Sequence, residues 1–153
     1  MSAIYVSRNT AFAATAGAKT MLKLITPTSF AIEIMEVGIS TDGVTSSAVP
    51  ATVDLFTSDE TTAGTNVGTA VTTQIKGATL AHGLTVGQNM SAEGTTYTVV
   101  KSFYLPQYMG MVVLQNPLGQ EEESPSGTAD SFGIRINVTA NVNVLSWIKW
   151  RRR

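Results

Sequence analysis

Two apolar, β-branched runs lie between residues 29 and 58 and constrain the fold more than any other feature. The runs cover residues 31–39 and 49–56, and the connection between them is rich in Thr, Ser, Asp and Gly. β-Branched residues fit a pleated, half-buried surface, and a connection of this composition is typical of a turn. The pattern therefore predicts two paired β-strands.

The apolar face of the first run changes side within the run. Ile32 and Ile34 have one parity, whereas Met35, Val37 and Ile39 have the other. Successive side chains of a strand point to opposite faces, so a single extra residue moves the apolar set to the other face. The phase change predicts either a β-bulge near Met35 or a strand that is covered on both faces.

The second run alternates regularly. Its apolar residues are Val49, Ala51, Val53 and Leu55. Thr52 and Asp54 lie between them, which predicts one face in a core and the other in solvent. Pro50 has no amide donor for a ladder, so we expect it at a strand start or on an edge strand.

The rest of the chain repeats the same kind of segment between turn signals and shows no helical periodicity. The further predicted strands cover residues 21–25, 70–75, 95–105, 109–115, 132–138 and 144–150. The run 109–115 is continuously apolar, which predicts cover on both faces, and the last two strands are expected to pair as a hairpin. Seven or eight short strands predict an all-β fold, an antiparallel, jelly-roll-like β-sandwich.

One domain accounts for the length. Residues 21–153 are expected to form the sandwich, with a short basic C-terminal tail, and residues 1–20 an extended N-terminal arm. The arm either docks on a neighbouring subunit or is an ordinary frayed terminus. Polar loops are expected at 59–68 and 116–130. The long connection 76–94 is expected to hold a short strand around 80–86 or an intersubunit contact.

Composition excludes several kinds of chemistry. The 153-residue chain has no Cys, one His and a net charge of −1. Disulfides and Cys-ligated metals are therefore excluded, and no overall field attracts nucleic acid or anionic lipid. No apolar run is long enough for a transmembrane helix, and the first residues lack the pattern of a signal peptide, so we expect a protein that is used without secretion.

Candidate catalytic and metal-binding residues are isolated. His82 has no second ligand at metal spacing, which favours a structural role. Residues 121–123 are three successive Glu, whose alternating directions suit a solvated loop better than a single cation. The sequence has no P-loop, Rossmann or nucleophile-elbow motif. We therefore expect no enzyme activity and no cofactor.

Residues 147–153, WIKWRRR, are the most prominent charge run. Three arginines beside two indoles can bind an acidic protein surface, stack on bases, or form a solubilising tail. Docking to an acidic protein surface is favoured, because a stable nucleic-acid site neutralises phosphates over a broader patch.

Several passages resemble a family of small virion proteins of tailed bacteriophages. The matching passages are AGAKT at 16–20, LITP at 24–27, GISTDGV at 38–44, SAVP at 47–50, VDL at 53–55, LQNPLG at 114–119 and NVNV at 141–144. They occur in order over most of the chain. The tail at 151–153 does not match the family pattern.

The resemblance implies a non-enzymatic β-sandwich protein on the outer surface of a phage capsid, made in the host cytoplasm. It implies a trimeric decoration or cement protein that binds the major capsid protein, with no nucleic-acid, membrane or small-molecule partner. The alternative is a carbohydrate- or receptor-binding jelly roll of a tail or fibre. The expected partner-binding residues are Ile4, Tyr5, Arg8, Phe12, Trp147, Lys149, Trp150, Arg151, Arg152 and Arg153. Alternating side chains of 109–114 are expected to build core and subunit interface.

Overall fold

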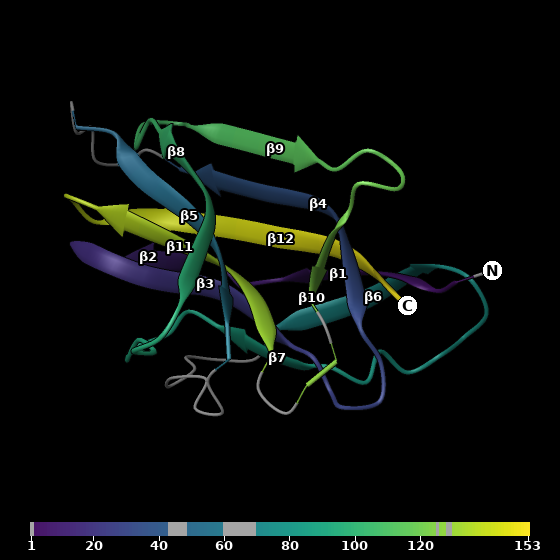
Figure 1. Cartoon of the computed structure of the whole chain (residues 1–153). Helices are drawn as coiled ribbons and strands as arrows, with labels where there is room; N and C mark the ends of the chain where they lie inside the picture. Colours follow the sequence, from purple (N-terminus) through teal and green to yellow (C-terminus); the bar gives the residue numbers. More distant parts are fainter. Residues whose placement is uncertain (1, 43–48, 60–69, 125, 128–129) are drawn as a thin grey trace.

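The computed structural model describes residues 2–42, 49–59, 70–124, 126–127 and 130–153. Two antiparallel sheets pack face to face and enclose one core (Figure 1). The strands are β1 Ile4–Arg8, β2 Phe12–Ala14, β3 Gly17–Ile25, β4 Ile32–Thr41, β5 Ala51–Ser58, β6 Val71–Lys76, β7 Thr85–Gln88, β8 Thr98–Leu105, β9 Met111–Gln115, β10 Glu122–Ser124, β11 Ser131–Val138 and β12 Val142–Arg152. The predicted all-β sandwich is confirmed.

Eight of the strands are connected as a jelly roll. One sheet holds the order β1-β12-β4-β9, and the other holds β3-β11-β5-β8. Three short strands extend these sheets: β6 pairs with β1, β7 with β3, and β10 with β4, while β2 pairs with β12. Most strands that follow one another in sequence therefore lie in opposite sheets.

This connectivity corrects the two predicted strand pairings. β4 and β5 lie in different sheets, and so do β11 and β12. The alternation of apolar residues was read correctly, because Val53 and Leu55 on β5 and Val144 and Ile148 on β12 are all buried. Alternation only shows that a strand has one buried face, and a strand in the opposite sheet satisfies it as well as a neighbour in the same sheet.

The predicted bulge in β4 is confirmed. Lys149 on β12 lies opposite Glu36, but the next residue, Trp150, lies opposite Ile34, so Met35 is the extra residue. On either side of Met35, the buried residues are Ile32 and Ile34, then Val37 and Ile39. Pro50 comes directly before β5, as expected for a strand start.

The predicted N-terminal arm is wrong. Residues 4–8 form β1, which lies inside a sheet between β12 and β6, and residues 12–14 form β2 on β12. Tyr5 is 1% exposed and its ring stacks on Trp150, with centroids 4.5 Å apart. Tyr5 and Ser7 are the two inward-facing residues of β1, and because Ser7 is polar, hydropathy alone does not reveal this buried face. Burial of Ser7 is tolerated because its hydroxyl accepts the Trp150 Nε1–H at 3.0 Å.

Three further segments differ from expectation. The segment 76–94 contains β7 at Thr85–Gln88, slightly after the predicted strand, and 116–130 contains β10, which pairs with β4. β9 is an edge strand whose outward residues are exposed, so it is not covered on both faces. The turn predicted at Asp42–Gly43 and the loop predicted at 59–68 lie largely outside the described residues.

Candidate functional site

One edge of each sheet lies on the same side of the sandwich. β8 is the edge of one sheet, β9 is the edge of the other, and residues 106–110 join them (Figure 1). The register places Met111 beside Ser40 and Val113 beside Gly38 on the outer face of β4, while Val112 and Leu114 pack against the core. The outer face of β9 therefore presents apolar side chains to solvent.

Trp147 extends this apolar face across β4. Gly38 lies between Val113 on β9 and Trp147 on β12, and a β-carbon at Gly38 would lie 2.0 Å from the indole. The indole therefore occupies the space that a side chain at position 38 would fill. Its Nε1–H donates to Glu36 at 2.9 Å.

Glu36 anchors the polar border of this face. It accepts the Trp147 indole N–H and also the Gln115 amide at 3.0 Å. The Trp147 bond, and to a smaller extent the Gln115 bond and the charge of Lys149, lower the pKa of the Glu36 carboxyl from its ordinary value, against the opposing effect of desolvation. The carboxylate therefore stays charged and fixes the indole in place.

The turn at 106–110 is rigidly held. The Thr41 hydroxyl accepts the Gly110 amide N–H at 3.0 Å and donates to the Pro106 carbonyl at 3.1 Å. The buried Gln107 amide donates to the Val49 carbonyl at 2.7 Å and to the Thr139 hydroxyl at 2.9 Å. The turn is therefore tied to β4 and to the segments that flank β5 and β12.

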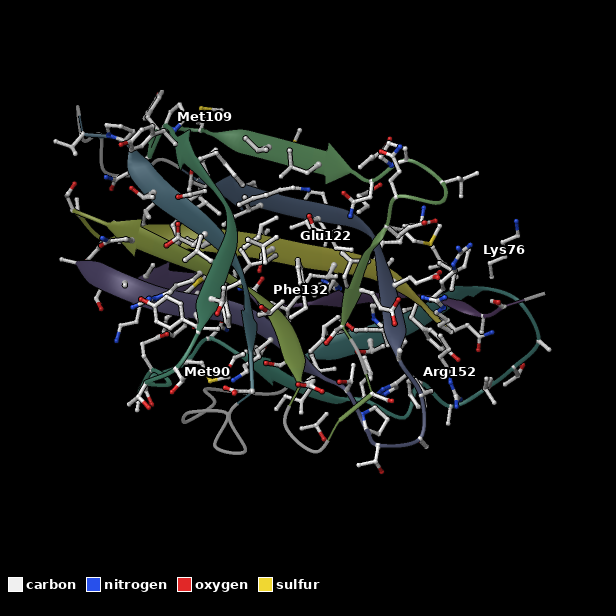
Figure 2. All side chains as sticks on the ribbon, in the orientation of Figure 1. Lys76, Met90, Met109, Glu122, Phe132 and Arg152 are labelled. Atoms are coloured by element: carbon white, nitrogen blue, oxygen red, sulfur yellow. The ribbon has the colours of Figure 1, made fainter. Side chains whose placement is uncertain are left out.

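This turn displays two apolar side chains. Tyr108 is 59% exposed and Met109 is 70% exposed, and Met109 has a φ of +48°. A residue with a β-carbon is uncommon in this left-handed region, and such outliers cluster at functional sites. Figure 2 shows Met109 at the outer corner where β8 and β9 meet.

We call this face the β9 surface and define it by six residues. They are Tyr108, Met109, Met111, Val113, Leu145 and Trp147. All except Trp147 have exposed fractions between 41% and 70%. If a fully exposed large side chain presents roughly 150–250 Å², these five leave roughly 500 Å² of apolar area in solvent. This is as large as the largest apolar patches of ordinary monomers, which often mark interaction sites.

The structure brings the two predicted docking segments together but buries part of them. β1 pairs with β12, so Ile4 lies opposite Arg151 and Arg8 lies opposite Trp147. Tyr5 and Trp150 face the core and are fully buried, which corrects their assignment as partner-binding residues. Phe12 packs partly against the core. Ile4, Arg8 and Lys149 lie on the outer side of the sheet.

The basic tail is also corrected, because it continues β12 and its arginines bind carboxylates of the same chain. Arg151 pairs with Glu33 and with Glu121, the latter at 3.2 Å, and Arg153 pairs with Glu123 and, at 3.8 Å, with Glu33. The hydrogen bond from Arg151 to Glu33 is the main cause that raises the pKa of the guanidinium. Arg152 stacks on Phe30, 3.9 Å from the ring centroid. The acidic surface expected on a partner is thus present on β4 and β10.

The middle residue of the acidic run closes the edge of the sandwich. Glu122 points inward from β10 and pairs with Lys101 of β8, which interrupts the apolar parity of that strand. The ion pair between Lys101 and Glu122 therefore links the edge strand β8 of one sheet to the edge strand β10 of the other. Inward charges on edge strands are a known device against edge-to-edge aggregation.

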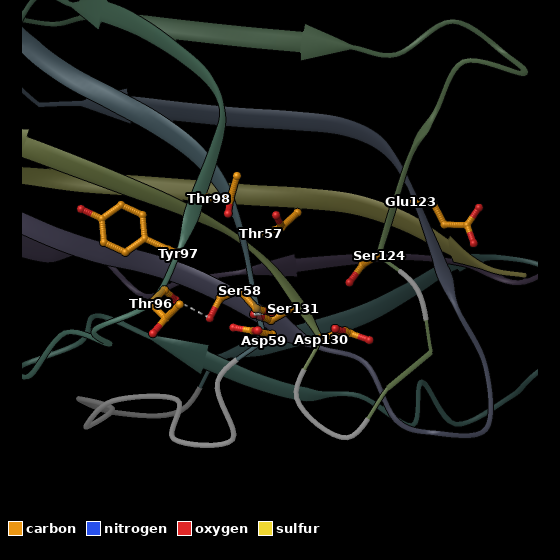
Figure 3. A pocket seen from close by; sticks show the side chains of 10 residues that line it. All are labelled: Thr57, Ser58, Asp59, Thr96, Tyr97, Thr98, Glu123, Ser124, Asp130 and Ser131. Carbon is orange, nitrogen blue, oxygen red and sulfur yellow. Dashed lines mark hydrogen bonds between the residues drawn. The ribbon is translucent and has the colours of Figure 1, made fainter.

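A polar pocket of about 450 Å³ opens at the end of the sandwich near β10. Figure 3 shows hydroxyl side chains from β5, β8, β10 and β11 around it, among them Ser58, Thr98 and Ser124, together with Asp59 and Asp130. Within the described parts of the chain, no three His, Asp or Glu side chains form a group that could hold a metal ion. His82 lies elsewhere, where its Nδ1 accepts the Leu84 amide N–H at 3.2 Å.

Sequence reasoning missed Tyr108 and Leu145 as surface residues. The signal for Met109, Met111 and Val113 was available, because they share one parity of an apolar run at an edge. Leu145 lies on the same face of β12 as Trp147. The alternation in the sequence placed it only opposite the buried residues Val144 and Ile148.

The described residues contain no helix that could span a membrane. Comparison with models of protein families, with curated proteins and with solved structures finds no match for this chain.

Proposed function

We propose that this chain is a non-enzymatic structural protein that decorates the outside of a tailed-phage capsid and stabilises it by binding major capsid protein subunits. The observation that carries the proposal is the β9 surface, an uncharged apolar area held on the edge strand β9, the outer face of β12 and a rigid turn. A fixed apolar surface fits docking to another folded protein, because little conformational entropy is lost on binding.

The proposal combines this surface with the resemblance found in the sequence. A jelly roll by itself hosts many unrelated functions and supports none of them. The passages at 16–20, 38–44 and 114–119 point to a virion protein, and the surface supplies the means of assembly. The ionic groups at the C-terminal end of β12 already have partners within the chain, which leaves apolar contacts as the main source of docking energy.

The mechanism is thermodynamic linkage. A protein that binds only the assembled shell stabilises it by an amount that grows with concentration and affinity. If copies associate, as the trimer implied by the resemblance would, each contact after the first becomes effectively intramolecular. Weak contacts by single copies are then sufficient to hold a capsid lattice together.

The test is co-sedimentation of the purified protein with expanded capsids that lack it. We expect saturable binding and a higher capsid disruption temperature. The variant Val113→Lys places a charge in the β9 surface and is expected to weaken binding at least tenfold. The matched control is Leu118→Lys, because Leu118 is 81% exposed but lies beyond the other end of β9. Absence of binding by the unmodified protein would refute the proposal.

A second candidate is a carbohydrate-binding module of a phage tail or fibre. It is favoured by the polar pocket near β10, whose lining of hydroxyls and carboxylates suits sugar hydroxyls and includes Tyr97. Its test is an NMR titration with neutral mono- and disaccharides. Shifts confined to Ser58, Thr98 and Ser124 would support it, and their absence at high sugar concentration would exclude it.

A further inference from the structure

A shallow hollow lies beside the rigid turn on the outer face of the same sheet. Its volume is about 170 Å³ and its lining includes Ala11, Ser40, Asp42 and Leu145. At roughly 30 Å³ per water molecule, this is space for five or six waters, comparable with one large apolar side chain. Asp42 at its rim is held by Asn143, whose backbone and side-chain amides both donate to the carboxylate.

The turn and the hollow are neighbours. The Thr41 amide N–H donates to the Gly110 carbonyl at 2.8 Å, and Thr41 also lines the hollow. The projecting Tyr108 and Met109 therefore lie directly beside a recess of matching size. A knob and a recess that lie side by side on one face are self-complementary, because a two-fold rotation between them places each knob in the recess of the other copy.

From this geometry we infer that the β9 surface binds a second copy of this chain, with Met109 as the anchor that enters the hollow beside Leu145. The inference rests on the proposed function and deepens it: the β9 surface contacts a second copy, and loss of that contact weakens capsid binding because the avidity of the associated copies is lost. Three observations lead to it: the area, the absence of charge among the six residues, and the conformation of Met109.

The area fits a contact between two copies. A standard interface buries about 800 Å² on each partner, and interfaces between identical copies are about 65% apolar. The roughly 500 Å² of apolar side-chain area supplies about that share. The remainder is supplied by the polar rim, including Ser40, Asp42 and Asn143.

The charge distribution favours a second copy over a membrane. None of the six residues of the β9 surface is cationic. The cations beside it are Arg8, opposite Trp147, and Lys149, on the adjacent register row, which acts on Glu36. Attraction to anionic lipid needs a cluster of free Lys or Arg at the surface. A second copy offers the same six uncharged residues, so the centre of the contact forms without desolvating a charge. Asp42 at the rim of the hollow keeps its hydrogen bonds from Asn143.

The conformation of Met109 separates an interface role from a merely structural one. Its left-handed φ is unfavourable for methionine, yet its side chain is exposed and contributes little to the core of a single copy. Asparagine tolerates this region much better. The substitution Met109→Asn should therefore leave the fold at least as stable while it removes the apolar anchor.

Sedimentation velocity over a concentration series tests the inference on the full chain. We expect the unmodified protein to form species heavier than the 16.2 kDa monomer. Met109→Asn and Leu145→Glu should each raise the dissociation constant at least tenfold, with an unchanged or higher melting temperature for Met109→Asn. The control Leu118→Asn removes an equally exposed apolar residue elsewhere and should associate like the unmodified chain.

Three results would overturn the inference. The unmodified chain could remain monomeric at millimolar concentration, or the Met109 and Leu145 variants could associate as the unmodified chain does. Co-flotation of a monomeric chain with phosphatidylcholine vesicles would likewise assign the surface to lipid. Self-association without capsid binding would leave the inference standing and remove only the proposed function, so the two failures are distinguishable.

Discussion

The indole of Trp147 lies across Gly38, where a β-carbon would come within 2.0 Å of the ring. A glycine in the interior of a strand normally weakens it, so alanine at such a position would ordinarily stabilise the fold. Here the glycine is required, because it lets an aromatic side chain on β12 reach toward β9 and complete the outer apolar face.

The variant Gly38→Ala should destabilise the protein. The new methyl group displaces the indole and breaks its hydrogen bond to Glu36, which we expect to cost about 1–3 kcal/mol. Urea unfolding followed by tryptophan fluorescence measures the change. Ser40→Ala, one register row along the same face, serves as control and should change stability by less than about 0.5 kcal/mol. Equal or greater stability of Gly38→Ala would contradict the packing described.

Trp147→Phe should change the pH dependence of stability. The pKa of Glu36 is lowered in the folded state from its ordinary value of 4.5, mainly by the indole N–H. Its contribution is therefore fully present above that value and is lost as the pH falls through the lower folded pKa. Phenylalanine removes the donor, so the variant should lose less stability than the unmodified protein between about pH 6 and pH 3.

Thermal melts at several pH values measure this difference. We expect a loss of roughly 1 kcal/mol at neutral pH for Trp147→Phe, typical of one partly exposed charge-assisted hydrogen bond. Identical acid profiles for the two proteins would show that the indole does not act on the Glu36 carboxylate.

The arginines at the end of β12 should contribute unequally. Each contacts two carboxylates, Arg151 those of Glu33 and Glu121 and Arg153 those of Glu123 and Glu33, but the Arg151 side chain is half as exposed, so solvent screens its pairs less. We expect Arg151→Met to cost about 1 kcal/mol after solvent screening and Arg153→Met to have little effect. The Arg151 effect should shrink as NaCl is raised from about 0.05 to 0.5 M, because salt screens partly exposed pairs. Equal, salt-independent effects would be inconsistent with ionic pairing.

Removal of residues 1–10 should prevent folding. The deletion takes away β1, leaves β6 without its neighbour and exposes Trp150, whose ring stacks on Tyr5 and whose Nε1–H is bound by Ser7. The single variant Trp150→Ala should cost about 3–5 kcal/mol. Circular dichroism and urea unfolding measure both. A truncated chain that still unfolds cooperatively would restore the arm predicted from the sequence.

The sequence predicts local features well where one residue type carries the signal. The parity change at Met35 gives the bulge, and Pro50 gives the start of β5, because both depend only on the chain nearby. The sheet partner of a strand is a different matter. β4 and β5 show the same alternation whether they pair or pack across the core, so the jelly-roll connectivity cannot be read from it.

The candidate site shows the same difference between local features, which the sequence predicts, and long-range contacts, which it does not. The exposed parity of Met111 and Val113 is visible in the sequence, whereas the partners of the basic tail are not. Arg151 meets Glu33, which is 118 positions away in the chain, and both are separately typical of solvated residues. Only the order of strands β10-β4-β12 places them in one row. Long-range charge pairs of this kind need the fold before they can be recognised.

The most direct test of the account is a cryo-EM reconstruction of the intact tailed-phage particle that we propose carries this protein. The proposed function predicts density for a β-sandwich on the outside of the capsid at its threefold positions. The face formed by Met109, Met111 and Leu145 should contact a second copy of this chain. Density confined to the tail, or a capsid exterior without this sandwich, would contradict it and would favour the carbohydrate-binding alternative.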